Sequence, residues 1–86
     1  MTGGITVDGE GAVRMHKHPR VTAVRTGSGA ASAGIRRGDV IMSVDGRGAL
    51  DPAALRDVRP GTRILLVVRR TERELRVQVQ TRRPTG

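Results

Sequence analysis

A glycine-rich stretch, with glycines at positions 27, 29 and 34, follows a candidate strand early in the chain. Glycines in such a place can cradle phosphates when they open a long helix within a βαβ unit. Here the helical stretch stops at Gly34, and only four residues separate that glycine from Asp39, where the next strand begins. The Gly-Lys-Ser or Gly-Lys-Thr of a Walker phosphate loop is also missing. We therefore expect a short structural helix and no nucleotide site.

Two further sets of residues have types that are used in metal binding or catalysis. His16 and His18 lie on one side of an extended segment and offer two imidazoles to a metal, but a third ligand is not evident. The serines at positions 28, 32 and 43 have no recognisable base with an orienting carboxylate nearby in the pattern. The sequence thus predicts unbound histidines, no metal, no cofactor and no catalytic activity.

The composition bounds the size of the domain and the chemistry of its core. With 86 residues the chain should form one domain over 1–86, with its core within 3–81 and a frayed tail at 82–86. It contains no Phe, Tyr, Trp or Cys, so a small aliphatic core has to stabilise it without disulfides. No apolar run approaches the roughly 18 residues that span a bilayer, and no targeting signal is evident, so the compartment stays undetermined.

The chain carries a net charge of +8, and 15 of its 16 basic residues are arginine. Such a charge attracts nucleic acid, anionic lipid or acidic peptides. The chain lacks the aromatic side chains on which single-stranded bases stack, so we do not expect nucleic-acid binding. Scattered arginines on solvated faces of a monomer are the simpler interpretation.

Local signals divide the chain into five strands and two short helices. Ser28 can cap the first helix and Gly34 can end it in a left-handed conformation. Asp51 and Pro52 mark the start of the second helix, as N-cap and first helical residue. Strands are expected at 4–7, 21–25, 39–44, 62–69 and 74–81, and helices at 28–33 and 52–58.

Alternation of apolar and polar residues predicts which strand faces are buried. In the last strand Leu75, Val77 and Val79 should point inward, with Arg76, Gln78 and Gln80 outward. In the strand 39–44 the alternating set is Val40, Met42 and Val44. The resulting fold class is mainly β (α+β), a small, partly open antiparallel barrel or sandwich capped by two short helices.

The order of motifs from Val21 to Gly46 resembles a PDZ domain of the bacterial, protease-associated type. The Pro that usually follows the serine of the helix motif is Gly29 here, and Asp39 is expected to bond nearby backbone donors. The two terminal strands also fit this family, so the resemblance covers residues 3–81. The matching segments are Val21-Thr-Ala-Val24, Gly27-Ser28-Gly29-Ala30-Ala31-Ser32-Ala33-Gly34-Ile35, Gly38-Asp39-Val40-Ile41 and Ser43-Val44-Asp45-Gly46.

The resemblance implies that the extended C-terminus of a partner adds as a strand beside one strand and one helix. In the family, a glycine-containing loop holds the terminal carboxylate, and Thr2-Gly3-Gly4-Ile5 is the candidate loop here, with Gly3 in place of an apolar residue. Asp51 would take a position that sets specificity in some relatives, although its cap role competes for the same side chain. The implied peptide-binding residues are Gly3, Gly4, Ile5, Thr6, Val7, Asp51, Leu55 and Val58.

The sequence therefore predicts a non-catalytic peptide-binding module, the regulatory or substrate-recognition domain of a bacterial protease. Its partners would be the C-termini or extended segments of proteins, and a protease domain of the same parent chain. A domain cut from such a parent would belong to the cell envelope, the periplasm or the secreted fraction. Two alternatives stay open: a structural docking domain with a closed groove, and a basic surface that binds anionic partners.

Overall fold

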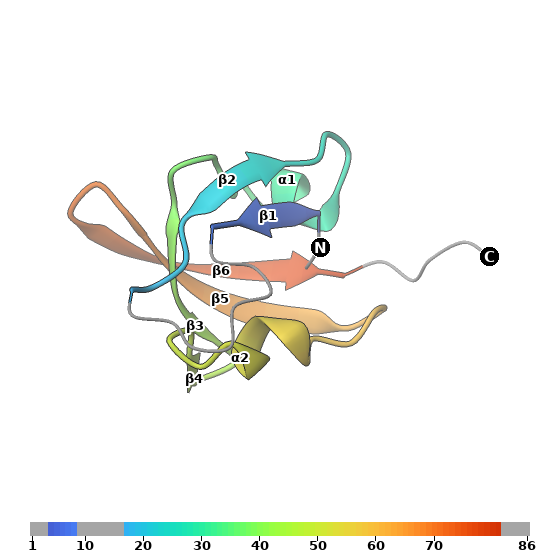
Figure 1. Cartoon of the computed structure of the whole chain (residues 1–86). Helices are drawn as coiled ribbons and strands as arrows, with labels where there is room; N and C mark the ends of the chain where they lie inside the picture. The colour runs from blue at the N-terminus through green and yellow to red at the C-terminus, as the bar shows by residue number, and fades with distance from the viewer. Residues whose placement is uncertain (1–3, 9–16, 82–86) are drawn as a thin grey trace.

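The structure of the chain, a computed structural model, describes residues 4–8 and 17–81. It contains six strands and two one-turn helices, which Figure 1 shows along the chain. The strands are β1 (Ile5–Val7), β2 (Val21–Val24), β3 (Val40–Val44), β4 (Arg47–Gly48), β5 (Arg63–Arg70) and β6 (Arg73–Gln80), and the helices are α1 (Gly29–Ser32) and α2 (Ala53–Arg56). Gly3, His16 and the tail at 82–86 lie outside the described residues.

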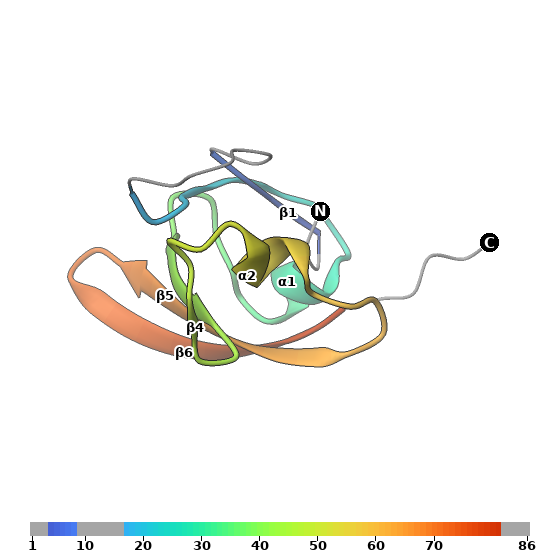
Figure 2. The same cartoon turned by 60° about the horizontal axis from the view of Figure 1, so that its bottom comes forward.

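The strands form two antiparallel sheets that confirm the predicted fold class. One sheet holds β1 and β2, and the other has the order β4-β3-β5-β6. The two sheets meet where β2 and β3 begin, because Val21 N–H donates to Asp39 O at 2.7 Å and Ile41 N–H donates to Pro19 O at 2.8 Å. Figure 2 shows the long β5–β6 ribbon on one side, β1 and β2 on the other, and both helices between them.

The core is aliphatic, as the composition predicts. It fills the space between the inner faces of the sheets and includes Ile41, Leu66, Val68 and Val79, all of which are buried. In β6 the prediction is confirmed, because Val79 is buried while Arg76, Gln78 and Gln80 are exposed. Burial of such side chains supplies most of the favourable free energy of folding.

The predicted alternation of β3 is wrong because the strand contains an irregularity. Its register against β5 shifts between Ile41 and Ser43, so two residues of β3 take the place of one. Ile41 and Val44 are therefore the buried residues of β3, and Met42 is only half-buried. A bulge of this kind depends on the partner strand and leaves no local pattern in the sequence.

The turns follow the predicted signals more closely. Asp45 and Gly46 have φ values of 48° and 84°, as a two-residue hairpin turn with both central residues left-handed requires. This turn leads into β4, which pairs Arg47 with Val44 and which the sequence analysis missed. The Asp45-Gly46 signal itself was visible, but a strand of two residues carries no alternation of its own.

Helix α1 has the predicted cap and stop. The Oγ of Ser28 accepts a hydrogen bond from Ala31 N–H at 3.1 Å, and Gly34 has a φ of 92°. The helix lies so close to β6 that a Cβ on Gly29 would overlap the backbone carbonyl oxygen of Gln80. Gly29, the departure from the family pattern, thus permits this close approach.

Asp39 is 2% exposed and joins the segment after α1 to β5. Its carboxylate accepts bonds from Arg70 Nε at 2.9 Å and Arg70 Nη2 at 2.8 Å. It also accepts Arg36 N–H at 3.0 Å, which confirms the predicted bond to a backbone donor. The same guanidinium donates to Gly34 O at 2.7 Å. One ion pair thus fixes the glycine stop of α1 and the end of β5 together.

Candidate functional site

Among the described strands, β1 has a hydrogen-bonded neighbour on one side. Arg25 N–H donates to Gly4 O at 2.7 Å, and Asp8 N–H donates to Arg20 O at 2.9 Å. These bonds bracket the strand and tie both of its ends to β2. Within the ranges 4–8 and 17–81, β1 pairs with β2 and with no other strand.

The opposite side of β1 therefore presents free backbone groups. Alternate residues of a strand turn their N–H and C=O groups to opposite sides. Since Gly4, Thr6 and Asp8 face β2, the backbone groups of Ile5 and Val7 point to the other edge. The side chain of Ile5 is buried in the core and that of Val7 packs against it, so the edge is anchored.

Gly4 opens this edge in a conformation that glycine favours. Its φ is 93°, and a Cβ at this position would overlap the side chain of Ser28, the cap of α1. The start of β1 thus rests on α1. Gly3, the predicted neighbour in the carboxylate-binding loop, lies outside the described residues.

Helix α2 is shorter than the predicted 52–58 and ends at Arg56. It begins at Ala53, with Pro52 at the N-cap position, so the predicted assignment of Asp51 and Pro52 is wrong by one residue. Asp51 still performs the capping expected of it, because its Oδ1 accepts Ala53 N–H at 3.0 Å. Three residues separate Arg56 from Pro60, so the predicted stop at Pro60-Gly61 does not set the end of α2.

The carboxylate of Asp51 accepts a hydrogen bond at each of its two oxygens. Its Oδ2 accepts Arg47 Nη2 at 3.0 Å, and Arg47 Nη1 lies 3.4 Å from Asp57 Oδ2. The bond from Ala53 N–H, followed by that from Arg47, holds the pKa of Asp51 below its ordinary value. One guanidinium from β4 thus contacts a carboxylate at each end of α2, and both oxygens of Asp51 already accept a hydrogen bond within the domain.

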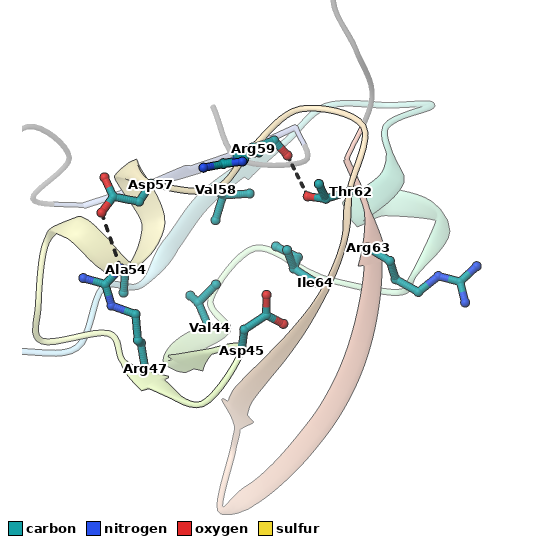
Figure 3. Close-up of a pocket in the computed structure, with 10 residues that line it drawn as sticks. All are labelled: Val44, Asp45, Arg47, Ala54, Asp57, Val58, Arg59, Thr62, Arg63 and Ile64. Carbon is teal, nitrogen blue, oxygen red and sulfur yellow. Dashed lines mark hydrogen bonds and ion pairs between the residues drawn. The ribbon is translucent and has the colours of Figure 1, made fainter.

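The other two predicted residues of this helix lie in different surroundings. Leu55 is half-buried on α2, and Val58 lies beyond its end. Figure 3 shows Val58 pointing into a pocket between α2 and β5, beside Val44 and Ile64. Because the helix stops at Arg56, a spacing of three residues no longer places Leu55 and Val58 on one helical face. Their shared role beside β1 stays a prediction.

The pocket has a volume of about 260 Å³ and contains no residue of β1. Its floor is apolar, and Arg47, Asp57 and Asp45 stand at its rim (Figure 3). The Oδ1 of Asp45 accepts Leu65 N–H at 2.7 Å, so this carboxylate helps to end the pairing of β3 with β5. The pocket was not predicted, because its walls come from three successive segments, 44–47, 54–59 and 62–64, whose packing against one another has no local sequence signal.

The structure gives one of the serines considered for catalysis a structural role. Ser28 is buried and its hydroxyl serves as a helix cap. Across 4–8 and 17–81, no three histidine, cysteine, aspartate or glutamate side chains gather closely enough to bind a metal. No helix in these ranges combines the length and the hydropathy needed to cross a bilayer.

The sequence profile of the PDZ domain matches residues 20–70, which are more than half of the chain. The chain belongs to the PDZ family. The match includes α1, α2 and both residues of the Asp39–Arg70 ion pair.

Individual relatives of this PDZ domain include proteases. A candidate zinc metalloprotease of Agrobacterium fabrum is 38% identical over 76 residues, which cover 84% of this chain and 20% of the relative. The structure of a serine endoprotease from Yersinia pestis has a TM-score of 0.69 at 30% identity and covers 92% of this chain and 27% of that one. The HtrA-type protease AlgW with a decapeptide has a TM-score of 0.78 at 26% identity, covering 98% of this chain and 30% of that one.

The identities and coverages also define how far the similarity extends. The chain is similar to the PDZ domains of bacterial proteases, and a domain of this family is a binding domain. It spans between a fifth and a third of the length of the relatives named above.

Proposed function

We propose that this PDZ domain binds the extended C-terminal segment of a protein by adding it as a strand to the free edge of β1. The observation that carries the proposal is the outward direction of the backbone groups of Ile5 and Val7, on a strand that pairs with β2 and with no other of the described strands. Main-chain hydrogen bonds to such an edge provide affinity in β-strand addition. The guest strand would lie along the side of β1 that faces away from β2, with α2 as its expected opposite wall, and we call this proposed site the β1–α2 groove.

The geometry favours a short, apolar recognition sequence. Two residues with outward backbone groups, Ile5 and Val7, can pair with about three residues of a guest strand. Leu55 on α2 and Val7 on β1 are half-buried apolar neighbours for the guest side chains. Both oxygens of Asp51 already accept a hydrogen bond within the domain, so we do not expect a guest hydroxyl to depend on this carboxylate. We expect Kd values in the micromolar range or weaker, about 8 kcal/mol of binding free energy at 1 µM.

The test is a titration of the chain with a library of free-acid C-terminal peptides, followed by amide chemical shifts. The expected result is saturable perturbation of the Ile5, Val7 and Leu55 amides. Val7→Pro removes an outward N–H without touching the bonds to β2, and it should weaken binding at least tenfold. Val7→Ala, which keeps the N–H, is the matched control and should lose much less. Binding that leaves all three amides unmoved, or that Val7→Pro does not weaken, would refute the groove.

Arg25 should contribute to the capture of a terminal carboxylate. Its backbone N–H is bonded to Gly4 O at 2.7 Å, and its side chain is exposed without an ion pair among residues 4–8 and 17–81. Arg25→Gln should therefore raise the Kd of a free-acid peptide about threefold to tenfold, and leave that of the amidated peptide unchanged. Arg37→Gln is the control, because Arg37 is exposed in the turn before β3, next to Gly38, whose N–H bonds to Val21 O at the end of β2 away from Arg25. Equal losses for both peptide forms, or an equal effect of Arg37→Gln, would exclude this role.

We further propose that the parent protein is a bacterial protease in which this domain recognises substrates or regulates activity. The similarity to protease PDZ domains supports this, including the AlgW structure whose name records a bound decapeptide. Such a parent would act at the cell envelope, in the periplasm or outside the cell. To test this role, the proteolytic activity of the intact parent is measured with and without peptide. We expect the peptide to stimulate or inhibit that activity, and Val7→Pro to abolish the effect.

A further inference from the structure

Among the described strands, β6 is an edge strand of the four-stranded sheet. Thr81 N–H donates to Thr62 O at 2.8 Å, and the β5–β6 register is regular from Arg63 to Arg70. Odd-numbered residues of β6 therefore bond to β5, and even-numbered ones turn their backbone groups outward. The outward residues are Glu74, Arg76, Gln78 and Gln80, and within the described part of the chain no further element hydrogen-bonds to their backbone.

One end of this edge is covered and the rest is open. Helix α1 approaches Gln80 so closely that Gly29 has no room for a Cβ. The stretch from Arg73 to Gln78 lies beyond this contact, and Figure 2 shows β6 at the margin of its sheet. The open stretch spans about 17 Å at the usual rise of a strand.

The side chains along this stretch have an uneven charge pattern. On the outer face, Glu74 stands opposite Arg69, with 4.0 Å between their charged atoms. Arg76 stands opposite Val67 and makes no ion pair with any of residues 4–8 or 17–81. On the inner face, Leu75 and Val77 are only half-buried, because no strand covers them at the edge.

A second copy of the same strand complements this pattern in one antiparallel register. When Leu75 of each copy lies opposite Leu75 of the other, Glu74 of each copy lies opposite Arg76 of the other. This register creates two cross-strand ion pairs and an apolar contact at its centre. In each half of the interface, Arg69 and Glu74 of one copy then form a row of alternating charges with Arg76 of the other copy.

Neighbouring registers are worse for identifiable reasons. Moving the centre to Arg76 places two arginines directly opposite each other, which is destabilising. Moving it to Val77 pairs Glu74 with Gln80, whose backbone carbonyl is covered by α1. Charge repulsion and the cover of Gln80 by α1 thus favour the register centred on Leu75 over these neighbours.

We propose that the chain forms an antiparallel dimer through the outer edges of β6, centred on Leu75, with Glu74 of each copy opposite Arg76 of the other. The two four-stranded sheets then join into one, with the two-fold symmetry of most homodimers. The β1 edge belongs to the other sheet and stays free in this arrangement. The dimer would therefore carry two peptide sites, in contrast to the monomer expected from sequence.

The test measures self-association of the 86-residue chain by sedimentation equilibrium from about 0.05 to 1 mM, since a contact well below about 1,200 Å² is weak. Wild type should dimerise in this range. Each of the single variants Glu74→Arg and Arg76→Glu places like charges opposite each other at two positions of the interface. Each should therefore raise the dimer Kd about tenfold. The double variant Glu74→Arg with Arg76→Glu restores both pairs and should return the Kd to within about threefold of wild type. Arg63→Glu, an equal charge change elsewhere on the same face, is the control.

Amide hydrogen exchange supplies a readout that does not depend on charge reversal. The N–H groups of Glu74 and Arg76 should become more protected as protein concentration rises, and those of Ile5 and Val7 should not. A chain that stays monomeric at 1 mM overturns the proposal. So does a dimer that both single variants leave intact, or that the double variant fails to restore.

Discussion

Replacing Asp39 with asparagine should lower the free energy of unfolding by about 3 kcal/mol, because it removes one charge of a buried, hydrogen-bonded pair. Asp39 accepts two bonds from Arg70 and one from Arg36 N–H, and its side chain is 2% exposed. Asparagine keeps the shape but turns an NH₂ donor toward these donors. Urea unfolding measures the loss. Asp57→Asn is the matched control, since that carboxylate is 56% exposed and its ion pairs should contribute less than about 1 kcal/mol.

The same pair makes a pH dependence whose sign can be stated. Burial by itself raises the pKa of Asp39, but the bonds and charges of Arg70 and Arg36 outweigh it and hold the pKa below its ordinary value. Stability from a depressed pKa is present above the unfolded value, about 3.9 for aspartate, and is lost as pH falls through the folded value. The difference between wild type and Asp39→Asn should therefore be constant from pH 5 to 7 and shrink below about pH 4. A difference that persists unchanged at pH 2, or is negligible at pH 7, contradicts this assignment.

The sequence predicted those parts of the fold that depend on near neighbours. The Ser28 cap, the Gly34 stop and the Asp45-Gly46 turn are interactions within a few residues, and each is present. Their signals are chemical, since a hydroxyl near free N–H groups or a glycine at positive φ acts the same way in any fold. This is why both ends of α1 and the turn after β3 were predictable in detail.

Features that depend on distant partners were not predictable. Arg70 is 31 positions from Asp39, and nothing in either local sequence indicates that they meet. The irregular register of β3 is set by β5, and α2 ends early although its sequence permits two more residues. The candidate site shares this limit, because the free edge of β1 is defined by the absence of a neighbour among the described strands.

Gly29→Ala should be the most damaging single-methyl change in α1. The added Cβ would overlap the carbonyl oxygen of Gln80, and a backbone atom cannot swing aside as a flexible side chain can. Overpacking of this kind should cost about 3 kcal/mol, or roughly 15 °C in Tm for a domain of this size. Thermal unfolding measures it. Gly48→Ala is the control, because Gly48 has open space around its Cβ position and should change the free energy of unfolding by less than about 0.5 kcal/mol.

The position of Gly29 also connects stability to the proposed function. Ser28, its neighbour, contacts Gly4 at the start of β1, so α1 is a spacer between β6 and the edge that would receive the guest strand. If the methyl group pushes α1 away from Gln80, Ser28 must move against Gly4. Gly29→Ala should then weaken peptide binding even at temperatures where the variant is fully folded, whereas Asp39→Asn, which acts at the other end of α1, should leave the affinity of the folded fraction nearly unchanged. Equal affinities for wild type and folded Gly29→Ala would mean that the β1 edge is positioned without α1.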